Sequence, residues 1–143
     1  MTAKKAVFSR RSGCPLNASV EMLGDRWSLL IIRDMMLLGR HTFKEFLNSY
    51  ERIASNILAN RLKRLEKYGI ISVAPDPDDG RSLIYSLTPK GLGLAPVLTE
   101  MVLWAAAYED TGNQALVRLI RKDKEHFLAE VRKRFAEPGK RST

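Results

Sequence analysis

Apolar and polar residues follow a helical period over the first half of the chain. Apolar side chains recur every three or four positions, and residues typical of helix ends separate the stretches. Pro15 suits a first helical position, and Asp25 and Ser55 are the expected N-caps of later helices. Thr42 and Glu45 form a capping-box pattern. The pattern predicts four helices, over residues 15–23, 25–38, 42–47 and 55–68.

The pattern changes to a β-prone one after residue 69. Two runs, residues 70–75 and 82–87, flank an Asp79-Gly80 pair, which is typical of a tight hairpin turn. In the second run alternate apolar residues share one face, as in a half-buried strand: Leu83, Tyr85 and Leu87. We therefore expect a two-stranded hairpin.

Two longer helices are expected after the hairpin. Thr88 and Pro89 suit the N-cap and first position of a helix that runs to about residue 109, and Pro96 should kink it. A second helix is expected over about residues 113–136. It carries one apolar stripe, formed by Leu116, Leu119, Ile120, Phe127, Leu128, Val131 and Phe135.

This order of elements predicts a mainly α chain with a small β-hairpin wing (α+β). Helix-turn-helix followed by a two-stranded wing is the arrangement of winged helix-turn-helix domains, in which the second helix of the pair enters a major groove. We divide the chain into a basic N-terminal arm (residues 1–13), a winged domain together with the helix that follows the hairpin (14–109) and a C-terminal helix (110–143).

The stretch "SNILANRLKRLEK", residues 55–67, separates its side chains by chemistry. At 100° per residue, the leucines at 58, 62 and 65 face one side. Asn can pair with an adenine edge, Lys can donate to guanine, and flanking arginines can reach phosphates. The candidate DNA-contacting residues of this helix are Ser55, Asn56, Asn60, Arg61, Lys63, Arg64 and Lys67.

A solvated charged face is the alternative interpretation of this helix. Three neighbouring features favour DNA reading instead: the short capped helix before it, the hairpin after it, and Arg81 at the hairpin tip. A wing arginine can enter a narrow minor groove. The aspartates beside Arg81, at 76, 78 and 79, weaken its charge but can orient it.

Composition narrows the remaining possibilities. The 143 residues carry a net charge of +8, which suits a polyanionic partner without requiring one. The single cysteine and two distant histidines, His41 and His126, give no metal-ligand spacing, and we expect no metal, cofactor or enzymatic activity. No apolar run reaches the roughly 20 residues of a membrane span, and we expect a cytoplasmic protein.

Several motifs resemble the HxlR-type family of bacterial transcriptional regulators: "CPLNASVEMLGDRWSLLIIRDMMLLGRHTFKEF", "IASNILANRLKRLEKYGII", "YSLTPKGLGLAPVL" and Trp104. The wing sequence is also similar to that of MarR-type regulators. The resemblance implies a homodimer on a palindromic operator of double-stranded DNA, without catalysis. It also implies that residues 55–67 are the recognition helix, that Arg81 is the wing arginine, and that the following helices form the dimer interface, for which we name Leu94, Leu98, Met101, Trp104, Leu116 and Ile120.

Cys14 is a candidate redox sensor, since some members of this family sense oxidants or electrophiles at the same "CP" position. If Pro15 begins a helix, the helix dipole together with Arg10 and Arg11 would favour the thiolate. The alternative is a small packed residue. For the chain as a whole, an RNA-binding or protein-docking winged helix without operator specificity is the competing function, and any small-molecule effector is unknown.

Overall fold

Residues 10–136 are described by a computed structural model, in which they form eight helices and one β-hairpin. Most of residues 1–13, the expected basic arm, lie outside the described part. The elements follow in the order α1 (Pro15–Leu23), α2 (Ser28–Leu38), α3 (Phe43–Leu47), α4 (Ser55–Lys67), β1 (Ile71–Pro75), β2 (Leu83–Leu87), α5 (Pro89–Leu92), α6 (Ala95–Tyr108), α7 (Gln114–Lys122) and α8 (Lys124–Ala136). The predicted winged helix-turn-helix class is confirmed.

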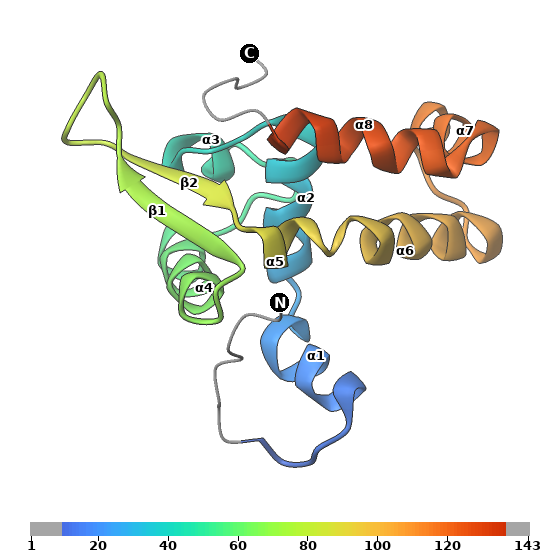
Figure 1. The fold of residues 1–143 in the computed structure, drawn as a ribbon, viewed down its shortest axis with the longest axis horizontal. Helices are drawn as coiled ribbons and strands as arrows, with labels where there is room; N and C mark the ends of the chain where they lie inside the picture. The colour runs from blue at the N-terminus through green and yellow to red at the C-terminus, as the bar shows by residue number, and fades with distance from the viewer. Residues whose placement is uncertain (1–9, 137–143) are drawn as a thin grey trace.

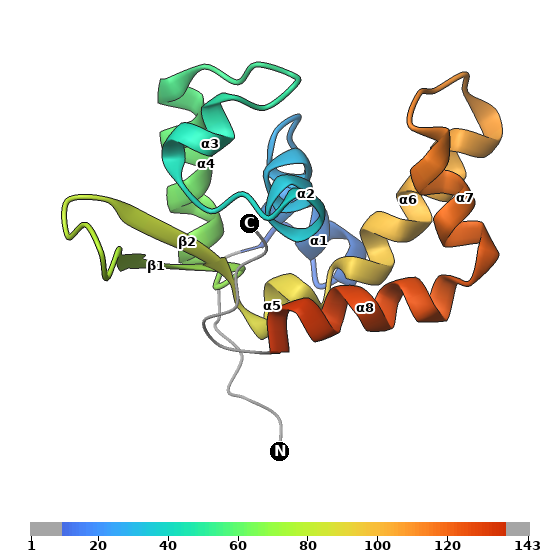
Figure 2. The ribbon, with the colours of Figure 1, turned by 90° about the horizontal axis from the view of Figure 1, so that it is seen from above.

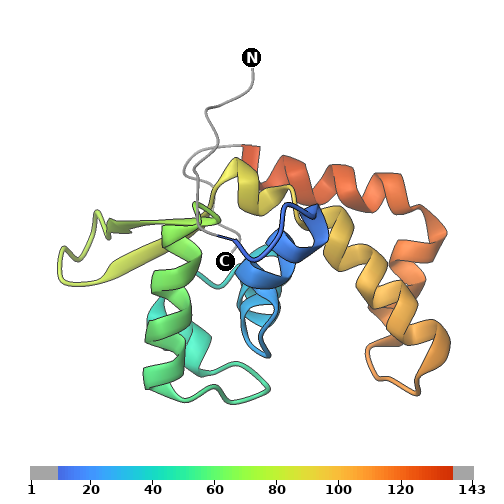
Figure 3. The ribbon, with the colours of Figure 1, turned by 90° about the horizontal axis from the view of Figure 1, so that it is seen from below.

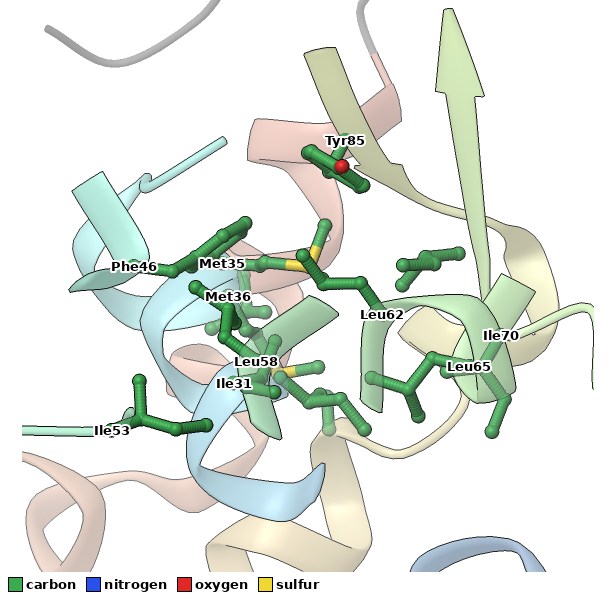
Figure 4. Packing of buried hydrophobic residues seen from close by; sticks show 14 of the residues in the cluster. Ile31, Met35, Met36, Phe46, Ile53, Leu58, Leu62, Leu65, Ile70 and Tyr85 are labelled. Atoms are coloured by element: carbon green, nitrogen blue, oxygen red, sulfur yellow. The ribbon is translucent and has the colours of Figure 1, made fainter. Parts of the chain in front are cut away.

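The core forms where α2, α3, α4 and the hairpin meet. Figure 4 shows Leu58 and Leu62 of α4 lying among Ile31, Met36 and other apolar side chains of α2. The ring of Phe46 on α3 meets Tyr85 on β2 edge to face, with 5.9 Å between ring centroids. Burial of these side chains holds α4 against the body of the domain and leaves its other face outward.

Several of the predicted helix ends are confirmed. Thr42 caps α3, since its hydroxyl accepts the backbone N–H of Glu45 at 3.2 Å. The C-terminus of α4 forms a Schellman motif, in which Ile70 N–H donates to the Leu65 carbonyl, and Gly69 provides the left-handed backbone at φ +72°. Thr88 caps α5 by accepting the N–H of Gly91 at 3.1 Å.

Two N-cap predictions need correction. The N-cap of α4 is Ala54, and Ser55 is its first helical residue. The helix α2 begins at Ser28, after a turn over residues 25–27. Asp25 nevertheless caps this turn, because its Oδ1 accepts the backbone N–H groups of Trp27 and Ser28 at 2.8 and 2.9 Å.

The hairpin is antiparallel, with Val73 opposite Tyr85. Its strands are joined by a seven-residue loop over residues 76–82, and the predicted turn at Asp79-Gly80 lies in this loop, where the N–H of Ser82 donates to the Asp79 carbonyl at 2.9 Å. The expected alternation of β2 was wrong in part, because Ile84 is buried as well as Tyr85 while Leu83 is exposed. The N–H of Tyr85 donates to the His41 carbonyl at 2.8 Å, which ties β2 to the segment before α3.

The two long C-terminal helices of the prediction are each divided. Pro96 does not kink a helix but lies in the first turn of α6, because the backbone turns at residues 93–94 after the short α5. The helix expected over residues 113–136 breaks at Asp123, whose backbone is extended (φ −161°, ψ 92°) and whose Oδ1 accepts the N–H of His126 at 3.0 Å. The break lets α8 fold back along α6.

The wing and the C-terminal helices lie at opposite ends of the molecule (Figure 1). Viewed from above, α6, α7 and α8 lie together on the side of the molecule away from the wing (Figure 2), and α6 and α8 pack against the winged domain. Seen from below, α1 lies in front of α2 and apart from the wing (Figure 3). Lys124 Nζ donates to Glu100 Oε1 at 2.7 Å and so links α8 to α6.

Candidate nucleic-acid interface

Helix α4 divides into a buried face and an exposed face. Its three leucines, Leu58, Leu62 and Leu65, lie in the core. Four of the predicted contact residues lie together on the outward face of the helix: Asn56, Asn60, Lys63 and Lys67. The structure therefore presents amides and ammonium groups on a single surface, as the helical periodicity predicted. Ser55 is also exposed, but it lies at the first helical position and on the side of Leu62.

Arg61 and Arg64 occupy a different environment from the other five. Arg61 Nε donates to Asp25 Oδ1 at 3.0 Å, and Arg64 Nη1 lies 3.9 Å from Asp25 Oδ2. Arg64 Nη2 also donates to the Glu21 carbonyl at 3.0 Å. Both arginines are half-buried and tie α4 to the junction of α1 and α2. The main partner of Arg61 is thus a carboxylate of its own chain, and that of Arg64 is a backbone carbonyl.

Asp25 is the centre of this junction. Burial raises the pKa of its carboxyl, but hydrogen bonds from the Ser28 hydroxyl and from the Trp27 and Ser28 N–H groups outweigh burial, with a smaller contribution from Arg61, and the pKa lies below the usual value. The carboxylate is therefore ionised at neutral pH. It fixes the position of α4 relative to α2.

Asn60 has a hydrogen bond to its neighbour. Arg61 Nη1 donates to Asn60 Oδ1 at 2.5 Å, while Asn60 itself is exposed. An amide that pairs with adenine needs its oxygen as acceptor and its nitrogen as donor. The hydrogen bond from Arg61 orients the Asn60 side chain. An adenine base that donates to Asn60 Oδ1 would have to share this oxygen with Arg61 or displace the Arg61 side chain.

A polar group under the turn before α4 holds that turn in place. We call Arg33, Asp34, Arg40, Ser49 and Glu51 the Arg33 cluster. The Arg33 guanidinium donates to both oxygens of Glu51 at 2.7 Å and to Asp34 Oδ1 at 2.7 Å. Asp34 is 1% exposed and also accepts from Arg40 at 3.2 Å. Hydrogen bonding from Arg33 lowers the pKa of Glu51 to about 2.

Arg81 lies on the exposed loop of the wing. The aspartates beside it serve the backbone: Asp79 Oδ1 accepts the N–H of Arg81 at 3.1 Å, and Asp76 Oδ1 accepts the N–H of Asp78 at 2.9 Å. Within the described residues no carboxylate forms a salt bridge with the Arg81 guanidinium. The aspartates thus shape the loop around this side chain.

Cys14 is exposed at the N-cap of α1, with Pro15 at the first helical position. The backbone N–H of Asn17, and after it that of Leu16, lowers the pKa of the thiol below its usual value. The predicted contribution of Arg10 and Arg11 is wrong, since the backbone of α1 provides the stabilisation. The N-terminus of α1 thus favours the thiolate form of Cys14, which is the reactive form of a cysteine.

The predicted dimer residues have different environments. Met101 and Trp104 are exposed on α6, and Trp104 is 68% exposed. Leu94, Leu98 and Leu116 are half-buried. Ile120 is only 1% exposed, so this residue packs inside its own chain and must be withdrawn from the predicted interface.

Sequence reasoning missed two residues of the exposed α6 face. Val97 and Tyr108 are exposed, and Tyr108 packs its ring 6.1 Å from that of Trp104. The spacing 97, 101, 104, 108 is that of one helix face and could have identified them. We call these four residues, Val97, Met101, Trp104 and Tyr108, the α6 stripe.

One stretch of the described residues has the length and apolar content of a membrane span. It is Pro89–Tyr108, of 20 residues. One such stretch is weak evidence, because a helix of a soluble protein meets the same criteria. Here the stretch is interrupted at residues 93–94, and α6 contacts α2, α7 and α8. A helix with one face on its own domain and one apolar face outward is typical of an interface between protein chains.

Metal chemistry has no support in the described part of the chain. Residues 10–136 contain no group of three or more His, Cys, Asp or Glu side chains arranged to hold a metal ion. His41 instead bonds the Gly39 carbonyl through Nδ1 at 3.0 Å, and His126 lies exposed on α8.

The fold, with an exposed polar face on α4 and an arginine on the wing, defines a winged helix-turn-helix transcriptional regulator. Residues 22–113 match the model of the HxlR-like helix-turn-helix family. The chain belongs to this family, as the resemblance predicted.

Individual relatives agree with this assignment. The chain is 36% identical to the HTH-type transcriptional regulator YodB of Bacillus subtilis over 101 aligned residues. The aligned region covers 70% of this chain and 89% of YodB. The crystal structure of PA1607, a putative transcription factor, superimposes with a TM-score of 0.65 at 35% identity, over 72% of this chain and 70% of PA1607. The reduced form of YodB gives a TM-score of 0.57 at 36% identity, over 71% of this chain and all of the YodB chain. The redox regulator HypR in its oxidised form gives a TM-score of 0.60 at 26% identity, over 68% of this chain and all of the HypR chain.

Proposed function

We propose that this regulator binds a palindromic operator in double-stranded DNA as a homodimer, in the cytoplasm and without catalytic activity. The observation that carries the proposal is the division of α4, whose leucines lie in the core while its amides and lysines lie outward. Such a helix can enter a major groove without unfolding any packed surface.

Within this proposal different residues of α4 contact the bases and the phosphate backbone. Asn56, Asn60 and Lys63 read base edges, and Ser55 and Lys67 at the two ends of the helix contact the backbone. Ala54 supplies no side-chain cap, so the first N–H groups of α4 can bind a phosphate. Arg61 and Arg64 hold α4 against Asp25 and add positive charge beside the groove.

The α6 stripe is the proposed centre of the dimer interface. Four large apolar side chains on one exposed helix face are costly to leave in water, and a second copy of the same helix covers them. Met101 and Trp104 form its centre, and the half-buried Leu94, Leu98 and Leu116 are proposed to contribute their exposed parts. The twofold axis would place two α4 helices about 34 Å apart, in successive major grooves.

Cys14 is the proposed redox sensor. Hydrogen peroxide would convert its thiolate to a sulfenic acid with release of hydroxide, and a small thiol would then condense with it to a mixed disulfide and water. Support comes from the lowered pKa of the thiol and from its exposure. Two relatives add support, since HypR is a redox regulator and YodB has been solved in diamide-treated and quinone-bound forms.

A selection from random duplexes, followed by a salt series, tests the proposal. We expect the full chain to enrich one palindromic sequence, and the log of its affinity to fall steeply with log salt concentration. A duplex RNA and a scrambled DNA duplex serve as competitors. Competition by either of them as strong as that by the selected duplex would contradict operator reading and favour the RNA-binding or protein-docking alternative.

A further inference from the structure

A cavity of about 290 Å³ lies between α2, α6, α7 and α8. Its wall is formed by apolar side chains from all four helices, among them Leu30, Leu98, Val102, Leu116, Phe127 and Val131. Natural ligand pockets start at about 300 Å³, and an engineered apolar cavity of about 150 Å³ binds benzene. The space is therefore large enough for one small organic molecule.

The chemistry of the wall limits what can bind there. Arg33 and Thr99 are the polar side chains among its lining residues. The Arg33 guanidinium is held by Glu51 and Asp34, and the Thr99 hydroxyl donates to the Ala95 carbonyl at 2.7 Å. A polar occupant would lose its hydrogen bonds to water and gain few in return, so the wall favours an uncharged apolar molecule.

Four of the fifteen lining residues come from the C-terminal helices. Leu116 and Ile120 belong to α7, and Phe127 and Val131 belong to α8. Both helices lie beyond residue 113, where the match to the family ends. The cavity is therefore closed by a part of this chain that the shared winged domain does not include.

We propose that this cavity is a binding site for a small, uncharged, apolar molecule, such as an aromatic compound of one to three rings. Such a molecule would fill space between α2 and the C-terminal helices and bury apolar surface on both sides.

The same site is suited to control α4, an extension that rests on the proposed function. Arg33 lines the cavity and also donates a hydrogen bond to Glu51 in the turn before α4. Met36 lines the cavity and packs in the core that α4 closes. A molecule that displaces either side chain would shift the turn or the helix that we propose to read DNA.

Titration of the full chain with N-phenyl-1-naphthylamine, an uncharged dye that fluoresces in apolar surroundings, tests the site. We expect saturable emission with one dye bound per chain. Ala105→Phe and Val102→Phe each place a ring in the cavity and should abolish this emission. Ala129→Phe adds the same ring to an exposed position of α8 that does not line the cavity, and should leave the emission unchanged.

Retained emission in both cavity variants, with circular dichroism showing that each is folded, would overturn the proposal, because the dye would then be bound elsewhere. Absence of saturable emission from the parent would overturn it as well. Binding to a selected duplex is measured separately on the parent without dye. A parent that binds the duplex but not the dye refutes the cavity alone, and one that binds the dye without any sequence preference refutes the proposed function.

Discussion

Replacement of Glu51 by glutamine removes the carboxylate that Arg33 grips with two hydrogen bonds of 2.7 Å. The pKa of Glu51 falls from 4.5 to about 2, chiefly because of this contact and to a smaller extent because of hydrogen bonds from the backbone and from Ser49. At about 1.36 kcal/mol per pKa unit, the difference of about 2.5 corresponds to at most about 3.4 kcal/mol of stability at neutral pH. Both side chains are 26% exposed, so solvent screening lowers the value, and we expect Glu51→Gln to cost about 1–2 kcal/mol.

The stability that Glu51 contributes depends on pH, and the direction of this dependence can be predicted. A carboxylate whose pKa is lowered on folding contributes its full stability above about pH 4.5 and loses it as the pH falls towards 2. Urea unfolding at pH 6.5 and pH 3 should therefore show a difference between parent and Glu51→Gln that shrinks by more than half at the lower pH. Glu130→Gln is the control, since Glu130 is exposed on α8 and forms no ion pair among the described residues. An equal difference at both pH values would refute the assignment of the stability to this ion pair.

Three further predictions concern the wing, the interface and the thiol. Arg81→Ala should weaken binding to every duplex and reduce the slope of log affinity against log salt by about 1, with base preference unchanged in a repeated selection. Trp104→Asp should convert a dimer to a 16.2 kDa monomer in light scattering, and an unchanged mass would exclude the α6 stripe as the interface. After treatment with peroxide, the parent should change its DNA affinity while Cys14→Ser keeps it; identical behaviour of the two would exclude Cys14 as a sensor.

The exposed face of α4 could be predicted because it depends only on helical periodicity. The same reasoning could not place Arg61 and Arg64, whose partner Asp25 lies far away in the sequence and meets them only in the folded domain. Their spacing on the helix is compatible both with phosphate contacts and with an internal ion pair. Only the tertiary structure distinguishes the two.

The C-terminal helices show a second limit of local patterns. Apolar residues keep a helical spacing on both sides of Asp123 and Lys124, so periodicity favours one long helix although these two positions of the stripe are charged. Asp123 instead takes an extended backbone and caps α8, which folds back so that Leu128 and Val131 reach the core. Pro96 is ambiguous in the same way, since a proline can interrupt a helix or begin one. The cavity depends on both breaks and therefore had no signal in the sequence.

The central claim is that the outward face of α4 reads base edges, and Asn60→Ala tests it most directly. Affinity is measured for the selected operator and for every single base change in it, with Gln114→Ala as a control that removes an exposed amide from α7 at the other end of the molecule. We expect Asn60→Ala to lose about 1–3 kcal/mol of discrimination at one position in each half-site, with the other positions unaffected. An equal loss on all duplexes, or no loss at all, would contradict base reading by this helix.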